Sequence, residues 1–176
     1  VYHKSYKKRL IQMGENPKKI YNYGSIGSEN ISKLKLLSKK SIEKKFKFKF
    51  LKKNLLVTFH PSTLENISPI NQFKEILKFL NSLEDTFLIF TSANTDYGGS
   101  QINNLIKNYT KKNIYKSIFI PSMGQTYYFS TLKYIDAVIG NSSSGIYETS
   151  QFKIGVINIG KRQLGRLQND NIINCE

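Results

Sequence analysis

The sequence predicts an α/β fold, a Rossmann-like parallel sheet of about six strands with helices on both faces. Two observations predict it. Short apolar runs alternate along the chain with amphipathic segments in which apolar residues recur every three or four positions, as in βαβ units. Small and polar residues directly follow several of the apolar runs, as they do where ligands bind at the carboxyl ends of parallel strands. Right-handed crossovers then place helices on both faces of the sheet.

The first elements are a helix and a short strand. Residues 6–13 have helical spacing, and Gly14 follows them as a helix-ending glycine. Residues 20–23 (Ile-Tyr-Asn-Tyr) are then predicted as a strand that runs into a Gly-Ser turn.

The central elements carry the strongest apolar signal. Residues 55–59 (Leu-Leu-Val-Thr-Phe) are predicted as a strand buried on both faces, which ends before His60. Apolar residues at helical spacing predict a helix over 70–83. The elements that follow are a strand at 86–91, a helix through 102–109 and a strand at 117–120.

The last third of the chain continues the alternation. The pattern predicts a helix over 127–134, a strand at 137–139, a helix over 146–151 and a closing strand at 155–159. No repeat or low-complexity linker divides the sequence, so one domain over residues 1–176 is expected.

Composition limits the class of protein. With 39% hydrophobic and 22% charged residues, the chain is expected to be globular rather than disordered. No apolar run approaches the roughly 20 residues that cross a bilayer, and no membrane association is expected. The single cysteine, Cys175, excludes an internal disulfide and fits a reducing compartment, so the cytoplasm is expected. Because the chain opens with Val1 rather than Met, we expect a fragment.

The net charge of +15 is concentrated at one end of the chain. Residues 1–60 hold 16 Lys or Arg and three Asp or Glu, whereas the other 116 residues have a balance of only +2. Basic and aromatic residues alternate over 44–50, as on a single-strand-binding surface. The favoured interpretation is a linker or edge segment whose phenylalanines face the core while the lysines stay solvated. No nucleic-acid partner is therefore expected.

The most informative segment is Gly140-Asn-Ser-Ser-Ser-Gly-Ile-Tyr-Glu148, which follows a predicted strand and leads into a predicted helix. Small residues allow close approach of a ligand, and the first turn of a helix attracts phosphate oxygens. Glu148 lies about one turn further on, within reach of ribose hydroxyls. The alternative is a structural Asn/Ser/Gly turn with a helix cap.

Four segments, in the family's order, resemble the C-terminal domain of the hydrolysing UDP-N-acetylglucosamine 2-epimerases. They are Arg9–Glu15, Lys53–Glu65, Gly140–Glu148 and Asn158–Arg166. The likeness extends over nearly the whole chain and is greatest to members that make N-acylmannosamine-type sugars for sialic or legionaminic acid pathways.

The resemblance implies a two-domain, glycosyltransferase-B-like enzyme with its active site in the cleft between the domains. The family eliminates UDP across C1–C2 and then adds water, so that UDP-N-acetylglucosamine and water give N-acetylmannosamine and UDP. It implies no cofactor and no metal. The carboxylates that transfer protons belong to an N-terminal domain. We therefore expect residues 1–176 to be the nucleotide-sugar-binding domain, a fragment that binds UDP and is inactive alone.

The resemblance also implies roles for particular residues. Ser142 and Ser143 would hold the diphosphate and Glu148 the ribose, while His60 would act catalytically at the phosphate or leaving group. Arg162 would pair with a phosphate or with Glu148.

Two further contacts follow from the resemblance and from the predicted strand ends. Asn94 would contact the nucleotide, and backbone groups around residues 119–121 would read the uracil. The structural alternatives are a histidine that anchors the loop before Pro61 and a solvated Arg162.

Two other functions stay open at this point. Donor-binding domains of glycosyltransferases with the same architecture share the diphosphate-at-helix arrangement. A basic nucleic-acid-binding module would instead use the lysines between Lys39 and Lys53. The sequence leaves open whether the intact protein forms a homo-oligomer.

Overall fold

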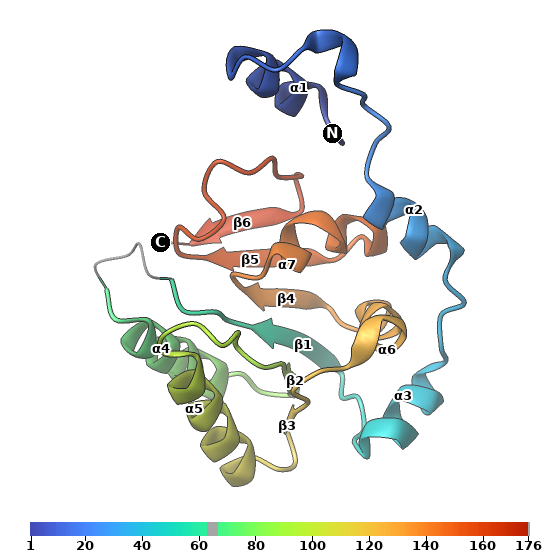
Figure 1. The fold of residues 1–176 in the computed structure, drawn as a ribbon. Coiled ribbons are helices and arrows are strands. Elements are labelled where there is room, and N and C mark those ends of the chain that lie inside the picture. Colours follow the sequence, from blue (N-terminus) through green and yellow to red (C-terminus); the bar gives the residue numbers. More distant parts are fainter. Residues whose placement is uncertain (63–66, 176) are drawn as a thin grey trace. The chain divides into compact units, whose positions relative to one another are not determined.

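The structure, a computed structural model, describes residues 1–62 and 67–175 (Figure 1). The last three residues of the segment Lys53–Glu65 that carries part of the family resemblance, residues 63–65, lie outside the described residues. The chain forms two compact units, Val1–Lys35 and Leu36–Glu176. Across the described residues, no helix has the length and apolar character that spanning a membrane requires.

The first unit holds α1 (Lys4–Gln12), the 3-10 turn η1 (Pro17–Lys19) and α2 (Ile26–Lys33). His3 caps α1, because its Nδ1 accepts a hydrogen bond from the Ser5 N–H at 3.2 Å. Gly14 follows α1 and has a φ of +94°, a conformation that glycine adopts without strain.

The prediction of a strand at residues 20–23 is wrong. Among the described residues, they form no ladder with another strand. The Ile20 carbonyl instead accepts a hydrogen bond from Lys7 Nζ at 2.9 Å, and Tyr21 and Tyr23 stack on each other with ring centroids 5.7 Å apart. The segment is extended and rich in β-forming residues, but a strand also requires a partner.

The second unit is built on a six-stranded parallel sheet with the order β3-β2-β1-β4-β5-β6. Its strands are β1 (Lys53–Thr58), β2 (Thr86–Phe90), β3 (Ser117–Phe119), β4 (Ala137–Gly140), β5 (Gly155–Ile159) and β6 (Ile172–Cys175). This is the strand order of the Rossmann fold. The predicted fold class is confirmed.

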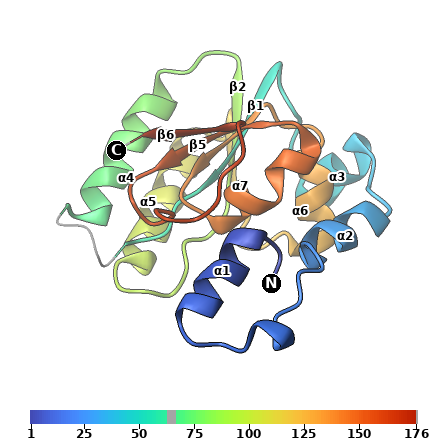
Figure 2. The same ribbon diagram turned by 90° about the horizontal axis from the view of Figure 1, so that it is seen from above.

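Helices cover both faces of this sheet (Figure 2). On one face, α4 (Pro69–Asn81) and α5 (Gly99–Lys112) pack on a core that includes Val57, Phe90 and Ile139. On the other face lie α3 (Lys39–Phe46), α6 (Gly124–Leu132) and α7 (Ser143–Tyr147) with the 3-10 turn η2 (Thr149–Phe152). Gly145 of α7 is so close to this face that an added Cβ would lie 3.2 Å from Val156. The alternation of side chains along each strand therefore supplies two separate cores.

The sixth strand is β6 rather than the predicted strand at residues 20–23. It pairs in parallel with β5, and the Asn158 Nδ2 donates to Asn174 Oδ1 across the pair at 2.8 Å. Its sequence, Ile-Ile-Asn-Cys, is short, and Ile173 is 69% exposed. An edge strand of this kind has no continuous apolar run, and the sequence pattern therefore did not predict it.

Residues 44–50, predicted to be a linker or edge segment, begin inside the helix α3. Ser38 caps this helix through its side chain, which accepts from the Ser41 N–H at 3.2 Å. After the helix, Phe48 and Phe50 are buried and Phe48 stacks on Phe87 of β2. The lysines of this segment are exposed. The expected division of phenylalanines inward and lysines outward is therefore confirmed, although the helix was missed.

Candidate functional site

The loops after β1 and β4 meet at the point where the strand order of the sheet reverses. β1 and β4 are adjacent, with Thr58 opposite Gly140, and β2 and β3 lie beyond β1 while β5 and β6 lie beyond β4. The chain therefore leaves these two neighbouring strands in opposite directions, which opens a crevice at their carboxyl ends. His60 follows β1, and residues 141–143 follow β4.

Asn141 joins the two loops. Its side-chain Oδ1 accepts from the His60 N–H at 2.7 Å, and its Nδ2 donates to the His60 carbonyl at 2.8 Å. Its own N–H donates to the Thr58 carbonyl at 3.1 Å. The residue is 1% exposed, so these bonds form away from water, where leaving a polar group unpaired is costly. Asn141 therefore fixes the backbone of His60 against the end of β4.

The His60 imidazole is held in one tautomer. Its Nδ1 accepts from the Asn94 N–H at 3.0 Å, which leaves the Nε2–H of the neutral ring free to donate. The pKa of His60 is lowered from 6.5 to about 4, chiefly by burial and also by the nearby Arg162 charge, while the Asp96 carboxylate opposes both. The free protein therefore presents a neutral imidazole with a single donor.

Folding stability should fall as the pH drops from about 6.5 toward 4, because the unfolded chain then protonates His60 while the folded chain resists it. Urea unfolding at several pH values checks this, with His60→Gln as the test variant and His3→Gln as its control. The wild type should lose more stability than His60→Gln over this range and the same amount as His3→Gln. Equal pH profiles for wild type and His60→Gln would contradict the assignment of a depressed pKa.

Arg162 lies beside the same residue. Its Nη1 donates to the Asn141 carbonyl at 3.0 Å, and the buried Gln163 donates to the same carbonyl through Nε2 at 2.7 Å. Burial and the neighbouring Arg166 lower the pKa of the Arg162 guanidinium, which nevertheless stays charged at neutral pH. Among the described residues, Arg162 forms no ion pair with Glu148. One guanidinium N–H is therefore committed to the loop. The nearby Asp96 carboxylate favours the charged guanidinium, but in the described part of the chain it forms no ion pair with Arg162.

The serines after β4 carry hydroxyl groups at the carboxyl end of that strand. Ser142 is the cap of α7, and its Oγ accepts from the Ser144 N–H at 3.3 Å, so its hydroxyl proton stays available. The Ser143 hydroxyl is half-buried and has no hydrogen-bond partner within the part of the chain that is described. The predicted helix over residues 146–151 is instead a five-residue α7 followed by η2. A helix this short has only a small dipole, so its individual N–H and O–H groups are the main donors that it offers.

Glu148 ends α7 and is linked to two hydroxyl groups. Its Oε2 accepts from the Ser144 hydroxyl, which also hydrogen-bonds to the Tyr128 hydroxyl. Tyr128 belongs to α6, sixteen residues earlier in the chain. No sequence signal pointed to Tyr128, whereas Ser144 lies in the Gly140–Glu148 segment but was given no role of its own.

The structure therefore connects most of the predicted site residues by short chains of hydrogen bonds. His60 and Arg162 both contact Asn141, and Asn94 contacts the His60 ring. Ser142 and Glu148 are both linked to Ser144. Asn94 also donates to Asp96 through its side chain. Asn141 and Gln163, like Ser144 and Tyr128, had no predicted role of their own. Asn141 and Gln163 lie in the motifs, but their burial could not be predicted.

Backbone groups near residues 119–121 are largely committed. The Ile120 N–H donates to the Phe90 carbonyl at 2.9 Å, and the Pro121 carbonyl accepts from the Ser92 N–H at 3.2 Å. These groups hold the end of β3 to β2. A role for them in reading uracil stays a prediction.

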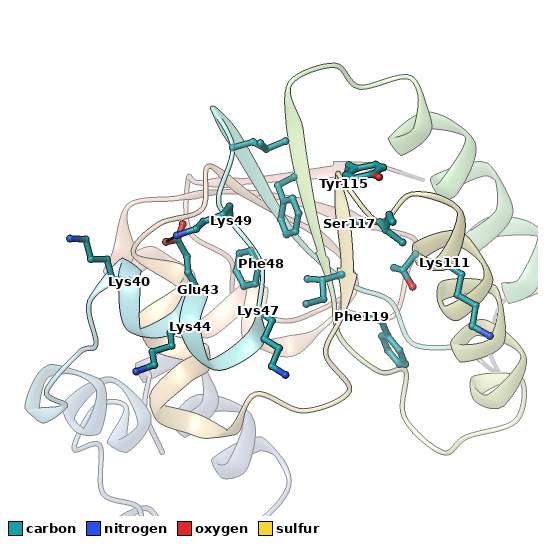
Figure 3. Close-up of a pocket in the computed structure, with 15 residues that line it drawn as sticks. Lys40, Glu43, Lys44, Lys47, Phe48, Lys49, Lys111, Tyr115, Ser117 and Phe119 are labelled. Carbon is teal, nitrogen blue, oxygen red and sulfur yellow. Dashed lines mark hydrogen bonds and ion pairs between the residues drawn. The ribbon is translucent and has the colours of Figure 1, made fainter.

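A large groove of about 840 Å³ lies elsewhere, at the β3 edge of the sheet (Figure 3). Lysines of α3 line one side and Lys111 of α5 the other, with Phe48 between them. Glu43 in this groove forms an ion pair with Lys49 at 3.0 Å. β2 and β1 separate β3 from β4. This groove is therefore distinct from the switch point, the place between β1 and β4 where the strand order reverses. In the described ranges, no group of three or more His, Cys, Asp or Glu side chains that could hold a metal ion occurs.

Comparison with known proteins decides the family. The family model described as UDP-N-acetylglucosamine 2-epimerase matches residues 1–176. The chain belongs to this family. A relative from Campylobacter jejuni, named GDP/UDP-N,N'-diacetylbacillosamine 2-epimerase (hydrolyzing), is 44% identical over all of this chain and 46% of its own length. The polysialic acid biosynthesis protein P7 of Escherichia coli is 38% identical over 96% of this chain and 42% of its own length.

Solved structures agree with the fold. The UDP-GlcNAc 2-epimerase of Methanocaldococcus jannaschii superposes with a TM-score of 0.65 at 14% identity, over 99% of this epimerase-family chain and 50% of its own. The S. aureus MnaA–UDP co-structure gives a TM-score of 0.62 at 17% identity, over 88% and 40%. The chain spans about half the length, or less, of the family members that it matches. The family is one of enzymes, and the match favours the epimerases over the glycosyltransferases.

Proposed function

We propose that residues 1–176 are the nucleotide-sugar-binding domain of a hydrolysing 2-epimerase and hold UDP at the β1/β4 switch point. The observation that carries the proposal is the convergence of His60 and Arg162 on Asn141, directly beside the serines that begin α7. Donors and a positive charge gathered at the carboxyl ends of parallel strands suit a diphosphate. The substrate class is a UDP-sugar whose C2 carries an acylated amine, as the names of the relatives suggest.

Each donor has a place in this binding mode. The Ser142 hydroxyl, the Ser143 hydroxyl and the Arg162 guanidinium would bind the diphosphate oxygens, and Glu148 would accept from the ribose hydroxyls. Asn94, whose Oδ1 is buried and unpartnered among the described residues, would lie at the nucleotide side of His60.

His60 would serve the leaving group. In the free protein it is neutral and donates through Nε2. A diphosphate beside it would raise its pKa, because an anion favours the imidazolium. As the C1–O bond breaks, the electron pair departs with UDP, and a donor at this position stabilises the charge that develops there. The proton at C2 would go to a base outside this chain, and water would then add to the resulting glycal.

The isolated chain should therefore bind UDP and release no sugar. A coupled assay for free N-acylmannosamine checks the second half of this statement. Sugar release from residues 1–176 alone would contradict it, because the proposal assigns proton transfer at C2 to the rest of the enzyme.

Arg162→Ala and Ser143→Ala should each weaken UDP binding by about 1–3 kcal/mol, since each removes a hydrogen bond to a charged ligand. Isothermal titration measures the affinity, and thermal unfolding checks that the fold is retained. Lys111→Ala is the matched control, because it removes one positive charge at the distant β3-edge groove. The control should leave UDP affinity unchanged.

A thermal-shift series with UDP, GDP and UMP tests the ligand class itself. UDP should stabilise the protein more than UMP, because the proposed site binds the β-phosphate as well as the α-phosphate. The proposal fails if UDP raises the unfolding temperature of wild type, Arg162→Ala and Lys111→Ala equally. It also fails if Lys111→Ala alone loses this stabilisation, because the diphosphate would then not bind at the switch point.

A further inference from the structure

A chain of three hydroxyl and carboxyl groups crosses from α6 to the end of α7. The Tyr128 hydroxyl contacts the Ser144 hydroxyl, and the Ser144 hydroxyl donates to Glu148 Oε2. Ser144 and Glu148 are four residues apart, so both project on one side of the helical turn. We infer that Tyr128 is a positioning residue, which acts through Ser144 to orient the Glu148 carboxylate toward the ribose diol of the nucleotide. The inference rests on the proposed function.

The direction of the hydrogen bonds follows from counting protons. A carboxylate has no proton to give, so Glu148 accepts and Ser144 must donate to it. A serine hydroxyl has one proton, which this bond uses. The contact between Ser144 and Tyr128 therefore requires Tyr128 to donate. Only a tyrosine hydroxyl, or another donor of the same reach, completes the chain at this position.

The surroundings keep Tyr128 in its donating form. Burial raises the pKa of the Tyr128 hydroxyl, and the negative charge of Glu148 raises it further, although the Ser144 hydrogen bond works in the opposite direction. The ring packs edge-on against Phe129 at a centroid distance of 5.6 Å. The donor is therefore protonated at neutral pH and is held in place by its neighbours.

The consequence for a ligand concerns geometry. A glutamate has several rotatable bonds, and ordering them costs conformational entropy when a ligand binds. The Ser144 bond fixes one oxygen of Glu148 before any ligand arrives, while Oε1 and the second lone pair of Oε2 stay able to accept. A carboxylate fixed in this way is pre-organised to accept from two neighbouring hydroxyls of a ribose.

The test compares two ligands that differ only in those hydroxyls. UDP and 2′,3′-dideoxy-UDP are titrated into the 176-residue wild-type chain and into Tyr128→Phe. We expect Tyr128→Phe to weaken UDP binding about five- to tenfold and to change the affinity for the dideoxy ligand less than twofold. Ser144→Ala should reproduce this pattern, and the double variant should be no worse than either single variant, because both changes break one chain.

Two further variants separate positioning from a general effect on the fold. Tyr134→Phe removes another half-buried tyrosine hydroxyl, which donates to the Leu37 carbonyl at 3.2 Å, and should leave the affinities for both ligands unchanged. Ser144→Thr retains the hydroxyl and should restore most of the preference for UDP. If Tyr128→Phe does not fold, Ser144→Ala and Ser144→Thr carry the same comparison.

The outcomes distinguish the inference from the proposed function. Equal losses of affinity for both ligands, or no loss for either, would overturn the positioning role while leaving the UDP site intact. A wild-type chain that binds both ligands equally well would overturn it in the same way. Binding of neither ligand by the wild type would overturn the proposed function, and the inference with it.

Discussion

Gly140→Ala should lower the free energy of unfolding by at least about 3 kcal/mol, because an added methyl group cannot fit between β4 and β1. A Cβ at Gly140 would lie 1.9 Å from the Thr58 carbonyl oxygen, and the residue has a φ of +137°. Alanine is strained in that conformation, and the neighbouring atom is backbone, which cannot turn aside. The two strands would have to separate where the switch-point loops leave them.

Urea unfolding measures this loss, with Gly155→Ala as the matched control. Gly155 begins β5 in the same sheet, and a Cβ there would meet no atom within 4 Å. The control should change stability by less than about 1 kcal/mol. Similar stabilities for the two variants would show that β1 and β4 are not packed as described.

Asn141→Ala should lower the free energy of unfolding by about 2–4 kcal/mol, since it leaves the N–H and the carbonyl of His60 without their partners. Both bonds form at a residue with 1% exposure. The alanine retains the backbone carbonyl that Arg162 and Gln163 contact, but the loop that carries His60 is released. We therefore expect UDP affinity to fall together with stability.

The control for Asn141 is Asn174→Ala. Asn174 also forms side-chain hydrogen bonds, one with Asn158 and two with Gln168. It lies on the exposed edge strand β6, where water replaces them. Its loss should be within about 1 kcal/mol. Urea unfolding of both variants makes the comparison. Equal losses of stability would mean that burial of Asn141 adds nothing to its hydrogen bonds with the His60 backbone.

The sequence was sufficient to predict the strands at the centre of the sheet. β1 and β2 were predictable because a strand buried on both faces is a continuous apolar run. The edge was not predictable. Residues 20–23 contain more β-forming side chains than residues 172–175, yet only the latter find a partner strand. Pairing is a property of the folded chain, and a local pattern does not contain it.

Helix α3 shows a different limit. Its lysines lie on the exposed side, and its core contact is essentially Ile42, so the apolar periodicity was weak. The helix-forming tendency of lysine and the serine cap at Ser38 were present in the sequence and would have supported the helix.

The site was predictable where function selects residue types and not where packing does. His60, Arg162 and the serines of the motif were identified from the family resemblance, and the structure brings His60 and Arg162 to one asparagine. Tyr128 reaches Ser144 from another helix, and no spacing in the sequence encodes that contact. Supporting residues of this kind become visible only once the helices are placed.

A crystal structure of the chain with bound UDP tests the central claim most directly. We predict the diphosphate within hydrogen-bond distance of the Ser143 hydroxyl and the Arg162 guanidinium, beside His60 Nε2, with the ribose at Glu148. A nucleotide found in the lysine-lined groove at β3, with the loops after β1 and β4 unoccupied, would contradict the account.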